Sequence, residues 1–275
     1  DEPELTGLVS RIVGKEPRLV IRNATEVVGM SEPPADALRK KKDSSMRVAI
    51  NLVKDGVAEA CVSAGNTGAL MATAKFVLKM LPGIDRPAII AELPAMGGTV
   101  HMLDLGANTQ ATAEHLFQYA VMGSIVAADI RGIVEPRIAL LNIGAEDTKG
   151  HDTVKEAAAV LSASTLNYVG FVEGTDLMSG KTDVVVTDGF SGNVALKTIE
   201  GTVAFGKHIL SRAFKRNWIT KLQAFLASSV LRHLSAEMDS RNYNGATLAG
   251  LNGIVIKSHG SADAYAFQHA IDTAI

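Results

Sequence analysis

Cysteine is nearly absent from this sequence, with Cys61 the only one among 275 residues. A single cysteine cannot form a disulfide within the chain, which is typical of a protein from a reducing compartment. Cys61 lies in the apolar run of residues 58–62 and precedes a turn rather than standing on one. We therefore expect a small buried side chain and not a nucleophile.

The sequence also has no excess of charge and no long apolar run. Its 27 Lys and Arg and 29 Asp and Glu residues give a formal net charge of −2, so nothing attracts nucleic acid to the whole chain. No stretch approaches the roughly 18 apolar residues of a membrane span, and the first residues are acidic where a signal peptide is basic. These absences predict a cytoplasmic protein with no nucleic-acid partner.

Several motifs of familiar chemistries are missing as well. The sequence contains neither a nucleotide-hydrolysing glycine loop that ends in Gly-Lys-Ser/Thr nor a Gly-x-Gly-x-x-Gly dinucleotide fingerprint. It has no Gly-x-Ser-x-Gly nucleophile turn and no His, Asp and Glu cluster with the spacing of metal ligands. We expect no metal and no cofactor, and a reaction whose nucleophile comes from a substrate.

The sequence does contain short β-rich runs, and these alternate with segments of helical period. This alternation predicts an α/β fold, a doubly wound and mostly parallel sheet with helices on both faces, because several runs are apolar at consecutive positions. Without repeats or linkers, we expect one domain over residues 1–275, with a helical excursion at about residues 205–240. The expected strands are residues 18–22, 60–63, 88–91, 100–104, 137–142, 168–172 and 183–187.

A glycine-rich turn follows the second of these runs. Gly65 and Gly68 allow a close approach of the backbone to an anion, and Asn66 or Thr67 can cap the helix that follows. In open α/β sheets, ligands bind at such strand-to-helix loops, where free N–H groups and helix dipoles face the ligand. A phosphate-binding loop and a plain capped turn both fit this stretch.

Similar turns follow other predicted strands, at Asp104–Asn108, at Asn142–Gly144 with Lys149 and Gly150 downstream, and at Asp188–Asn193. Such loops along one sheet edge are expected to converge on one crevice. Asp104 and Asp188 would repel an anion, so we expect them to bond backbone N–H groups and hold the turns.

The segment of residues 244–260 reads as a helix-like piece and a short strand, followed by a turn that carries Lys257, Ser258 and His259. Lysine and histidine beside glycine at this position suit anion binding and proton transfer. A helix-capping role for His259 is the alternative.

Together these motifs closely resemble, in order and over nearly the whole chain, the PlsX family of bacterial acyl-ACP:phosphate acyltransferases. The resemblance implies a homodimeric enzyme that moves a long fatty acyl group from acyl carrier protein to inorganic phosphate for phospholipid synthesis. It also implies a fold akin to phosphate acetyltransferases and isocitrate dehydrogenases. The motifs are residues 44–46, 62–71, 104–108, 141–144, 187–194, 196–201, 243–246 and 256–260.

This resemblance leads to roles for the turn residues. We expect phosphate to bind the Gly65–Gly68 backbone with Asn66 and Thr67, assisted by Lys257 and Lys149. His259 is the candidate proton donor or orienting group. Asn108 and Asn193 are expected to supply amide donors, with Asp188 among the catalytic residues. The family's amino-terminal strand and glycine loop are not matched by any motif here.

A basic amphipathic segment lies in the expected helical excursion. Apolar residues at helical spacing alternate there with cations, which fits contact with an acidic acyl carrier protein or a membrane surface. Burial in the core or in a dimer interface is the alternative. The residues expected to make the contact are Arg212, Lys215, Arg216, Lys221, Leu222, Phe225 and Arg232.

The expected partners are acyl carrier protein, inorganic phosphate, a second copy of the chain, and the inner face of the membrane or a downstream membrane acyltransferase. Two other functions remain open. One is a phosphate acyltransferase that uses a coenzyme A thioester. The other is a non-catalytic scaffold that binds an acyl carrier or a membrane.

Overall fold

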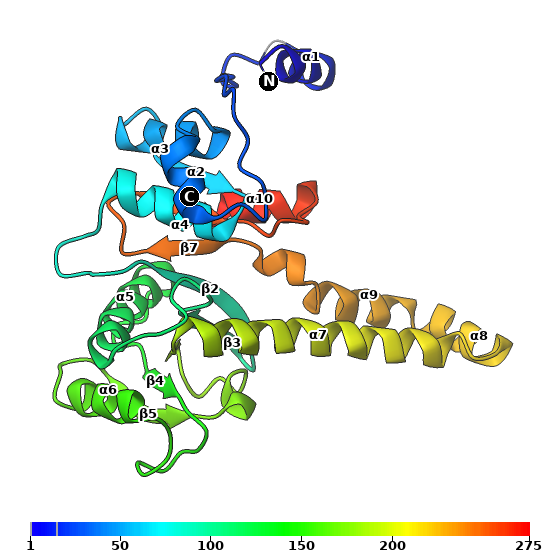
Figure 1. Ribbon diagram of the computed structural model, residues 1–275. Helices are drawn as coiled ribbons and strands as arrows, with labels where there is room; N and C mark the ends of the chain where they lie inside the picture. The colour runs from blue at the N-terminus through cyan, green and yellow to red at the C-terminus, as the bar shows by residue number, and fades with distance from the viewer. Residues whose placement is uncertain (1, 15) are drawn as a thin grey trace. The chain divides into compact units, whose positions relative to one another are not determined.

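The computed structural model describes residues 2–14 and 16–275 and divides into two compact units (Figure 1). Unit 1 contains the chain up to Pro87 together with Gly245–Ile275, and unit 2 contains Ala88–Asn244. The chain therefore leaves unit 1 once and returns to it near its carboxyl end.

Unit 1 pairs strands from distant parts of the chain. Strand β1 (Ala60–Ser63) runs parallel to β8 (Ile254–Lys257), and β7 (Ala246–Ala249) pairs antiparallel with β8. The side chains of Cys61, Val255 and Ile256 are buried in this layer. The helices of unit 1 are α1 (Glu2–Ile12), α2 (Pro34–Lys40), α3 (Ser45–Lys54), α4 (Thr67–Leu78) and α10 (Ala264–Asp272).

Unit 2 is built on a five-stranded layer of order β2-β3-β6-β4-β5. Strands β2 (Ala88–Ala95) and β3 (Gly98–Leu103) form an antiparallel hairpin, and β3, β6 (Val184–Val186), β4 (Ile138–Leu141) and β5 (Tyr168–Val172) run parallel. All three valines of β6 are fully buried, because both faces of this central strand are covered. The expected α/β class and mostly parallel sheet are confirmed.

The helices of unit 2 follow its strands. Helix α5 packs on β3 and β6, where a Cβ on Gly123 would lie 2.6 Å from Val184 Cγ1, so glycine permits the close approach. The elements are α5 (Ala113–Arg131), α6 (Asp152–Ser162), α7 (Gly189–Phe214), α8 (Trp218–Leu226) and α9 (Ser228–Glu237), with 3₁₀ turns η1 (Gly174–Asp176) and η2 (Ser240–Tyr243).

Two sequence expectations about secondary structure are wrong. In the described structure, residues 18–22 form no strand, and Leu19 and Val20 stay exposed because no neighbouring strand pairs with them. The helix-like piece after residue 244 contains strand β7 instead. Gly245 and Gly250 flank it with positive φ angles of 124° and 88°, a conformation that ends a helix.

The carboxyl part of α7 continues into α8 and α9, which together occupy the region of the expected excursion (Figure 1). We call residues 205–240 the helical arm. Among the described residues, no helix has the length and apolar composition needed to cross a membrane.

Close packing of α7 on the end of β3 gives a prediction about Gly192. A Cβ on Gly192 would lie 2.0 Å from the carbonyl oxygen of Asp104, whereas one on Gly201 of the same helix meets no described atom within 4 Å. We expect Gly192→Ala to lower the free energy of unfolding by about 1–3 kcal/mol. Gly201→Ala should raise it by up to about 1 kcal/mol through helix propensity. Urea unfolding of both variants checks this, and equal stabilities would contradict the packing argument.

Candidate functional site

Two predicted motifs of unit 1 lie side by side because β1 and β8 are parallel neighbours. Ser63 pairs with Lys257 at the carboxyl ends of the strands, and the Ser258 N–H donates to the Ser63 carbonyl at 2.9 Å. A Cβ on Gly260 would lie 3.6 Å from the Ala64 carbonyl oxygen. The structure therefore brings the Gly65–Gly68 turn and the Lys257–Gly260 turn to one edge.

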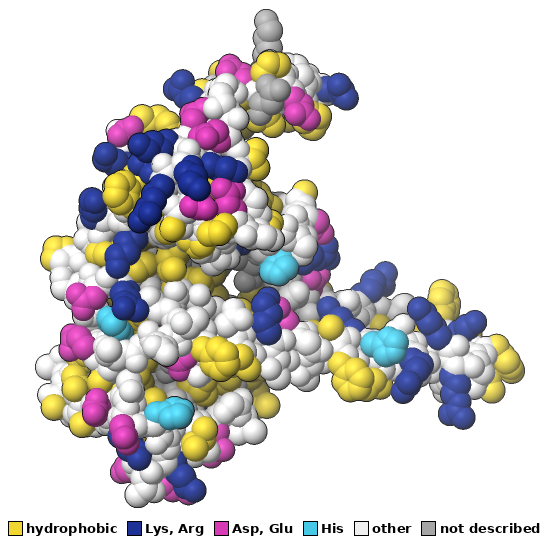
Figure 2. Space-filling view, viewed as in Figure 1, with side chains coloured by type: hydrophobic (Ala, Val, Ile, Leu, Met, Phe, Trp, Pro, Cys, Tyr) yellow, Lys and Arg dark blue, Asp and Glu magenta, His cyan; other side chains and the backbone are white. Residues whose placement is uncertain are grey.

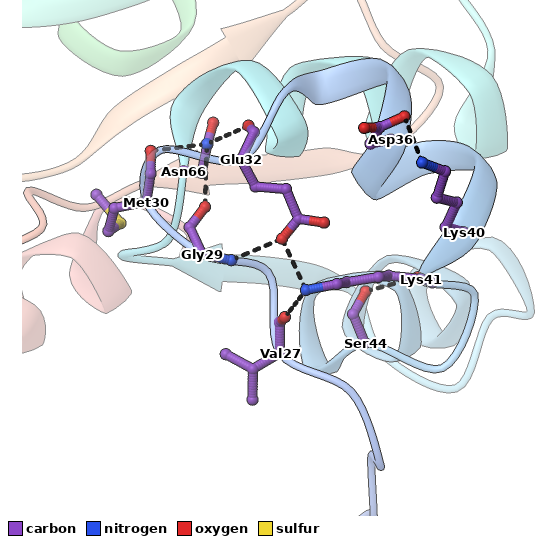
Figure 3. Close-up of polar contacts among 9 residues, drawn as sticks. All are labelled: Val27, Gly29, Met30, Glu32, Asp36, Lys40, Lys41, Ser44 and Asn66. Atoms are coloured by element: carbon purple, nitrogen blue, oxygen red, sulfur yellow. Dashed lines mark hydrogen bonds and ion pairs between the residues drawn. The ribbon is translucent and has the colours of Figure 1, made fainter.

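The Asn66 side chain is bonded to the protein on both of its polar atoms. Its Oδ1 accepts from the Ala69 N–H at 3.0 Å, which caps α4, and its Nδ2 donates to the carbonyls of Gly29, Met30 and Glu32 (Figure 3). The side chain is nearly buried. The capping expectation for Asn66 is confirmed. The Gly65 N–H donates to Ser63 Oγ at 3.2 Å, so the Thr67 and Gly68 N–H groups are the backbone donors of this turn that can meet an anion.

Thr67 and Gly68 are the first two residues of α4. Their N–H groups have no acceptor within the helix, and the helix dipole places partial positive charge at this end. A Cβ on Gly68 would lie 2.7 Å from Pro34 Cγ, so a side chain here would collide with the start of α2. Glycine therefore lets α2 cover the first turn of α4 while the backbone remains close to the edge.

Lys257 and His259 stand in the neighbouring turn. The Lys257 ammonium contacts the carbonyl of Ser258, and the His259 Nδ1 accepts from the Ser261 N–H at 3.2 Å. Since Nδ1 accepts a hydrogen bond, the neutral imidazole carries its proton on Nε2. A neutral His259 can thus donate a hydrogen bond from Nε2, which suits the predicted orienting role, whereas the predicted proton transfer uses the imidazolium form.

Asp104 organises a turn of unit 2. Its carboxylate, fully buried after β3, accepts from the backbone N–H groups of Ile89, Gly106, Ala107 and Asn108 at 2.7–3.2 Å and from Asn108 Nδ2 at 3.0 Å. Burial raises the pKa of the Asp104 carboxyl, and these donors act in the opposite direction. The expectation that Asp104 bonds backbone N–H groups and holds its turn is confirmed.

The Asp188–Asn193 turn meets this loop within unit 2. Asp188 caps α7 by accepting from the Phe190 and Ser191 N–H groups, as expected of a turn-holding carboxylate. The Gly189 N–H donates to the Asn108 carbonyl at 2.8 Å, and Asn193 Nδ2 donates to the Leu105 carbonyl at 3.1 Å. Two of the predicted turns are thus joined, and both predicted amides, Asn108 and Asn193, bond protein atoms.

Lys149 lies in the loop after β4, the strand next to β6. The loop is closed by Asn142, whose Nδ2 donates to the Lys149 carbonyl at 3.2 Å. Gly150 has a φ of 89°, and a Cβ there would collide with Asn142. Lys149 therefore stands at the same edge of unit 2 as the turns after β3 and β6.

The helical arm exposes its apolar side chains. Trp218 and Phe225 are each 74% exposed, and Leu222 is 51% exposed, while among the described residues no side chain of α8 or α9 is buried. Burial of this stripe in the core of the chain is therefore wrong. A capping box still defines the start of α8, where Asn217 accepts from the Thr220 N–H at 2.9 Å.

The arm also concentrates positive charge. Residues 212–232 contain five Lys and Arg residues and no Asp or Glu. Figure 2 shows dark-blue cationic side chains among yellow hydrophobic ones along the arm, on the right of the view. An exposed surface of this composition suits an acidic or amphiphilic partner.

Cys61 does not take part in this chemistry. It is buried in β1, and burial raises the pKa of its thiol to about 11. The thiolate form needed for nucleophilic attack is therefore scarce near neutral pH.

Sequence reasoning missed the turn of residues 29–32, which touches Asn66. The residues in contact are separated by 34 to 37 positions in the sequence, so no local pattern predicts these contacts. The nearest sequence signal is the pair Pro33-Pro34, which indicates a turn before α2 but not what the turn contacts.

The chain is similar in sequence to a known protein family over its whole length. The family model described as fatty acid synthesis protein matches residues 1–275. The chain is 60% identical over 258 residues to a phosphate acyltransferase of Alkalilimnicola ehrlichii, covering 94% of the chain and 75% of the relative. It is 57% identical over 276 residues to the phosphate acyltransferase of Nitrosococcus oceani, covering 100% and 81%.

Solved structures show the same fold at low sequence identity. A phosphotransacetylase from Streptococcus pyogenes matches with a TM-score of 0.57 at 22% identity, covering 87% of this chain and 69% of that one. EutD phosphotransacetylase from Staphylococcus aureus matches with a TM-score of 0.57 at 16% identity, covering 100% and 83%. The expected likeness to phosphate acetyltransferases is confirmed for the fold.

Replacing Asp104 or Asp188 with asparagine should change the free energy of unfolding to different extents. Asp104→Asn places an amide N–H₂ group among N–H donors, so it should destabilise the fold by about 1–3 kcal/mol. Asp188→Asn should leave stability nearly unchanged, because asparagine caps helices as well as aspartate. Denaturant unfolding measures both. A stable Asp104→Asn variant would show that the buried carboxylate does not hold its turn.

Proposed function

The chain belongs to the fatty acid synthesis protein family and is a phosphate acyltransferase, and we propose that its acyl donor is a long-chain acyl-ACP and its acceptor inorganic phosphate. The names of the close relatives support the reaction class. The observation that carries the proposal is the adjacency of the Gly65–Gly68 and Lys257–Gly260 turns at the carboxyl ends of β1 and β8. The acyl phosphate product would serve phospholipid synthesis.

Phosphate is itself the nucleophile in this scheme. One phosphate oxygen attacks the thioester carbonyl carbon, the carbon–sulfur bond breaks, and the sulfur leaves as a thiolate that takes up a proton. The protein then has to position phosphate, stabilise the oxyanion and support the leaving thiolate. No nucleophilic side chain is needed, which agrees with the buried Cys61.

In unit 1 we assign phosphate binding to the Gly65–Gly68 turn, through the Thr67 and Gly68 N–H groups beside the Asn66 cap, and to the Lys257 ammonium. The start of α4 offers N–H groups and a positive dipole to the anion. His259, as the imidazolium, is the proposed proton donor to the departing thiolate, and as the neutral imidazole it can orient phosphate through Nε2–H. Asn66 supports binding through its cap.

In unit 2 we assign supporting roles to Asn108, Asp188, Asn193 and Lys149. The contacts of the first three fix two joined turns, and Lys149 is a cation in the loop after β4 of the same unit. Asp188 is proposed to act by keeping the amino terminus of α7 in place. Each of these roles is a proposal that kinetics of single variants can test.

The helical arm is the proposed contact surface for acyl carrier protein, the membrane, or both. Acyl carrier proteins are acidic, and the five cations of residues 212–232 give this nearly neutral chain a local positive surface. We also propose a homodimer located in the cytoplasm, with peripheral contact to the inner face of the membrane or to a membrane acyltransferase that uses the product.

The decisive experiment incubates the protein with phosphate and either long-chain acyl-ACP or acyl-CoA, and measures acyl phosphate. We expect acyl phosphate from acyl-ACP with a higher kcat/KM than from acyl-CoA. A preference for acyl-CoA would replace the proposed donor. If neither donor gave product, the chain would act as a scaffold.

Lys257 and His259, both in the second turn, should affect different kinetic constants. Lys257→Met should raise the KM for phosphate by about tenfold or more, because a charge-assisted contact of roughly 1.5–3 kcal/mol is lost. His259→Ala should lower kcat by about 10²-fold, the smaller end of general-acid effects, with little change in the KM of the donor. Steady-state kinetics separates the two, and wild-type constants in both variants would make these residues structural.

The helical arm should respond separately to changes of charge and of apolar contact. Replacing Lys215, Arg216 and Lys221 with Glu should raise the KM for acyl-ACP, more so at low salt, and barely change that for phosphate. Replacing Leu222 and Phe225 with Ser should release the protein from anionic liposomes in a flotation assay. Both side chains are exposed, so the monomer should still fold. Unchanged acyl-ACP kinetics together with loss of the dimer would show an interface instead.

A further inference from the structure

The turn of residues 29–32 lies against the amino terminus of α4 (Figure 3). Asn66 Nδ2 donates to the carbonyls of Gly29 at 3.2 Å, Met30 at 2.9 Å and Glu32 at 3.0 Å. The same side chain caps α4 through Oδ1. Any movement of the turn therefore shifts the group that orients the first N–H groups of the helix.

Glu32 closes this turn on itself. Its carboxylate accepts from the Gly29 N–H at 3.0 Å and from the Lys41 ammonium at 2.7 Å, and its own N–H donates to the Gly29 carbonyl at 3.1 Å. The Lys41 hydrogen bond and then the Gly29 N–H hold the pKa of the Glu32 carboxyl below its usual value. The carboxylate thus stays ionised and paired at neutral pH.

Lys41 ties the turn to the junction of α2 and α3. Its ammonium also contacts the Val27 carbonyl, its backbone N–H donates to the Ala37 carbonyl, and its carbonyl accepts from Ser44 Oγ at 2.9 Å. The Lys41 and Glu32 side chains are only 30% and 18% exposed. A pair this shielded from solvent is screened less than a surface pair and restricts both partners.

A second contact makes α2 part of the same support. Pro34, at the start of α2, fills the space beside Gly68, where a Cβ would lie only 2.7 Å from Pro34 Cγ. Met30, within the turn, approaches the other candidate loop, since its Cε would lie 3.2 Å from a Cβ on Gly260. Residues 29–34 therefore contact both loops of the unit 1 site.

From these contacts we propose that Glu32 and Lys41 are positioning residues for phosphate, which act through the Gly29–Glu32 turn and the Asn66 cap without touching the substrate. This inference rests on the proposed phosphate site at Gly65–Gly68. Its physical reason is that binding an anion with backbone N–H groups requires those groups to be held within about 0.5 Å of their productive positions. Loosening the turn should weaken phosphate binding and leave the KM for the acyl donor unchanged.

The neighbouring Lys40, the last residue of α2, supplies a matched control. Lys40 forms an exposed i,i+4 pair with Asp36 at 3.2 Å, whereas the neighbouring Lys41 pairs with Glu32 (Figure 3). Lys41→Met should raise the KM for phosphate by about three- to tenfold, with kcat and the KM for the acyl donor within about twofold. Lys40→Met should change none of these constants. Lys41→Arg should restore most of the phosphate affinity, because it keeps the charge paired with Glu32. A role of Lys41 in bulk stability alone does not predict an effect confined to the KM for phosphate.

Amide NMR of the purified protein separates this inference from the proposed function. If inorganic phosphate leaves the Thr67 and Gly68 amide signals of the unmodified protein unchanged, the proposed phosphate site is wrong. If phosphate shifts these signals with the same affinity in unmodified protein and in Lys41→Met, the positioning role is wrong. Glu32→Gln, which keeps an acceptor for the Gly29 N–H but loses the charge, serves as the test if Lys41→Met does not fold. Weaker phosphate binding in a folded variant supports the proposal.

Discussion

Parallel pairing of β1 with β8 is the constraint on which the candidate site of unit 1 depends. It aligns Ser63 with Lys257, so two turns from opposite ends of the sequence leave the sheet at the same edge. An antiparallel pairing would have sent them to opposite edges. Because the loops after parallel strands also carry the amino ends of helices, the same pairing supplies N–H groups, a helix dipole and a cation together.

Hydrogen bonds from polar side chains to the backbone give these turns their shape. Asn66 caps α4 and donates to three backbone carbonyls. Asp104 accepts from four backbone N–H groups, and Asp188 caps α7. In each case the side chain faces the protein and fixes the direction of neighbouring backbone groups. Such an arrangement suits a reaction whose nucleophile is a substrate, because positioning and charge stabilisation are then what the protein must provide.

Local sequence signals predicted most of the strands and the turn residues, because apolar runs and glycine turns depend mainly on the conformation of the residues that form them. They failed where the outcome depends on distant partners. Residues 18–22 have the composition of a strand but no neighbour to pair with in the described part of the chain. Residues 246–249 form a strand because β8 lies beside them. The contact of Asn66 with the Gly29–Glu32 turn was equally out of reach, since its partners are more than 30 residues away.

In the helical arm, the sequence predicts the helices but not whether their apolar side chains are buried. Helix periodicity predicts an amphipathic stripe there, but periodicity cannot tell a buried stripe from an exposed one. The structure leaves Trp218, Leu222 and Phe225 exposed to solvent, while the Asn217–Thr220 capping box defines the start of their helix, α8. Exposing such side chains is unfavourable for an isolated chain, and five cations without a neighbouring carboxylate in residues 212–232 repel one another. An acidic or amphiphilic partner would relieve both costs at once, so the same features that weaken the arm alone favour its association.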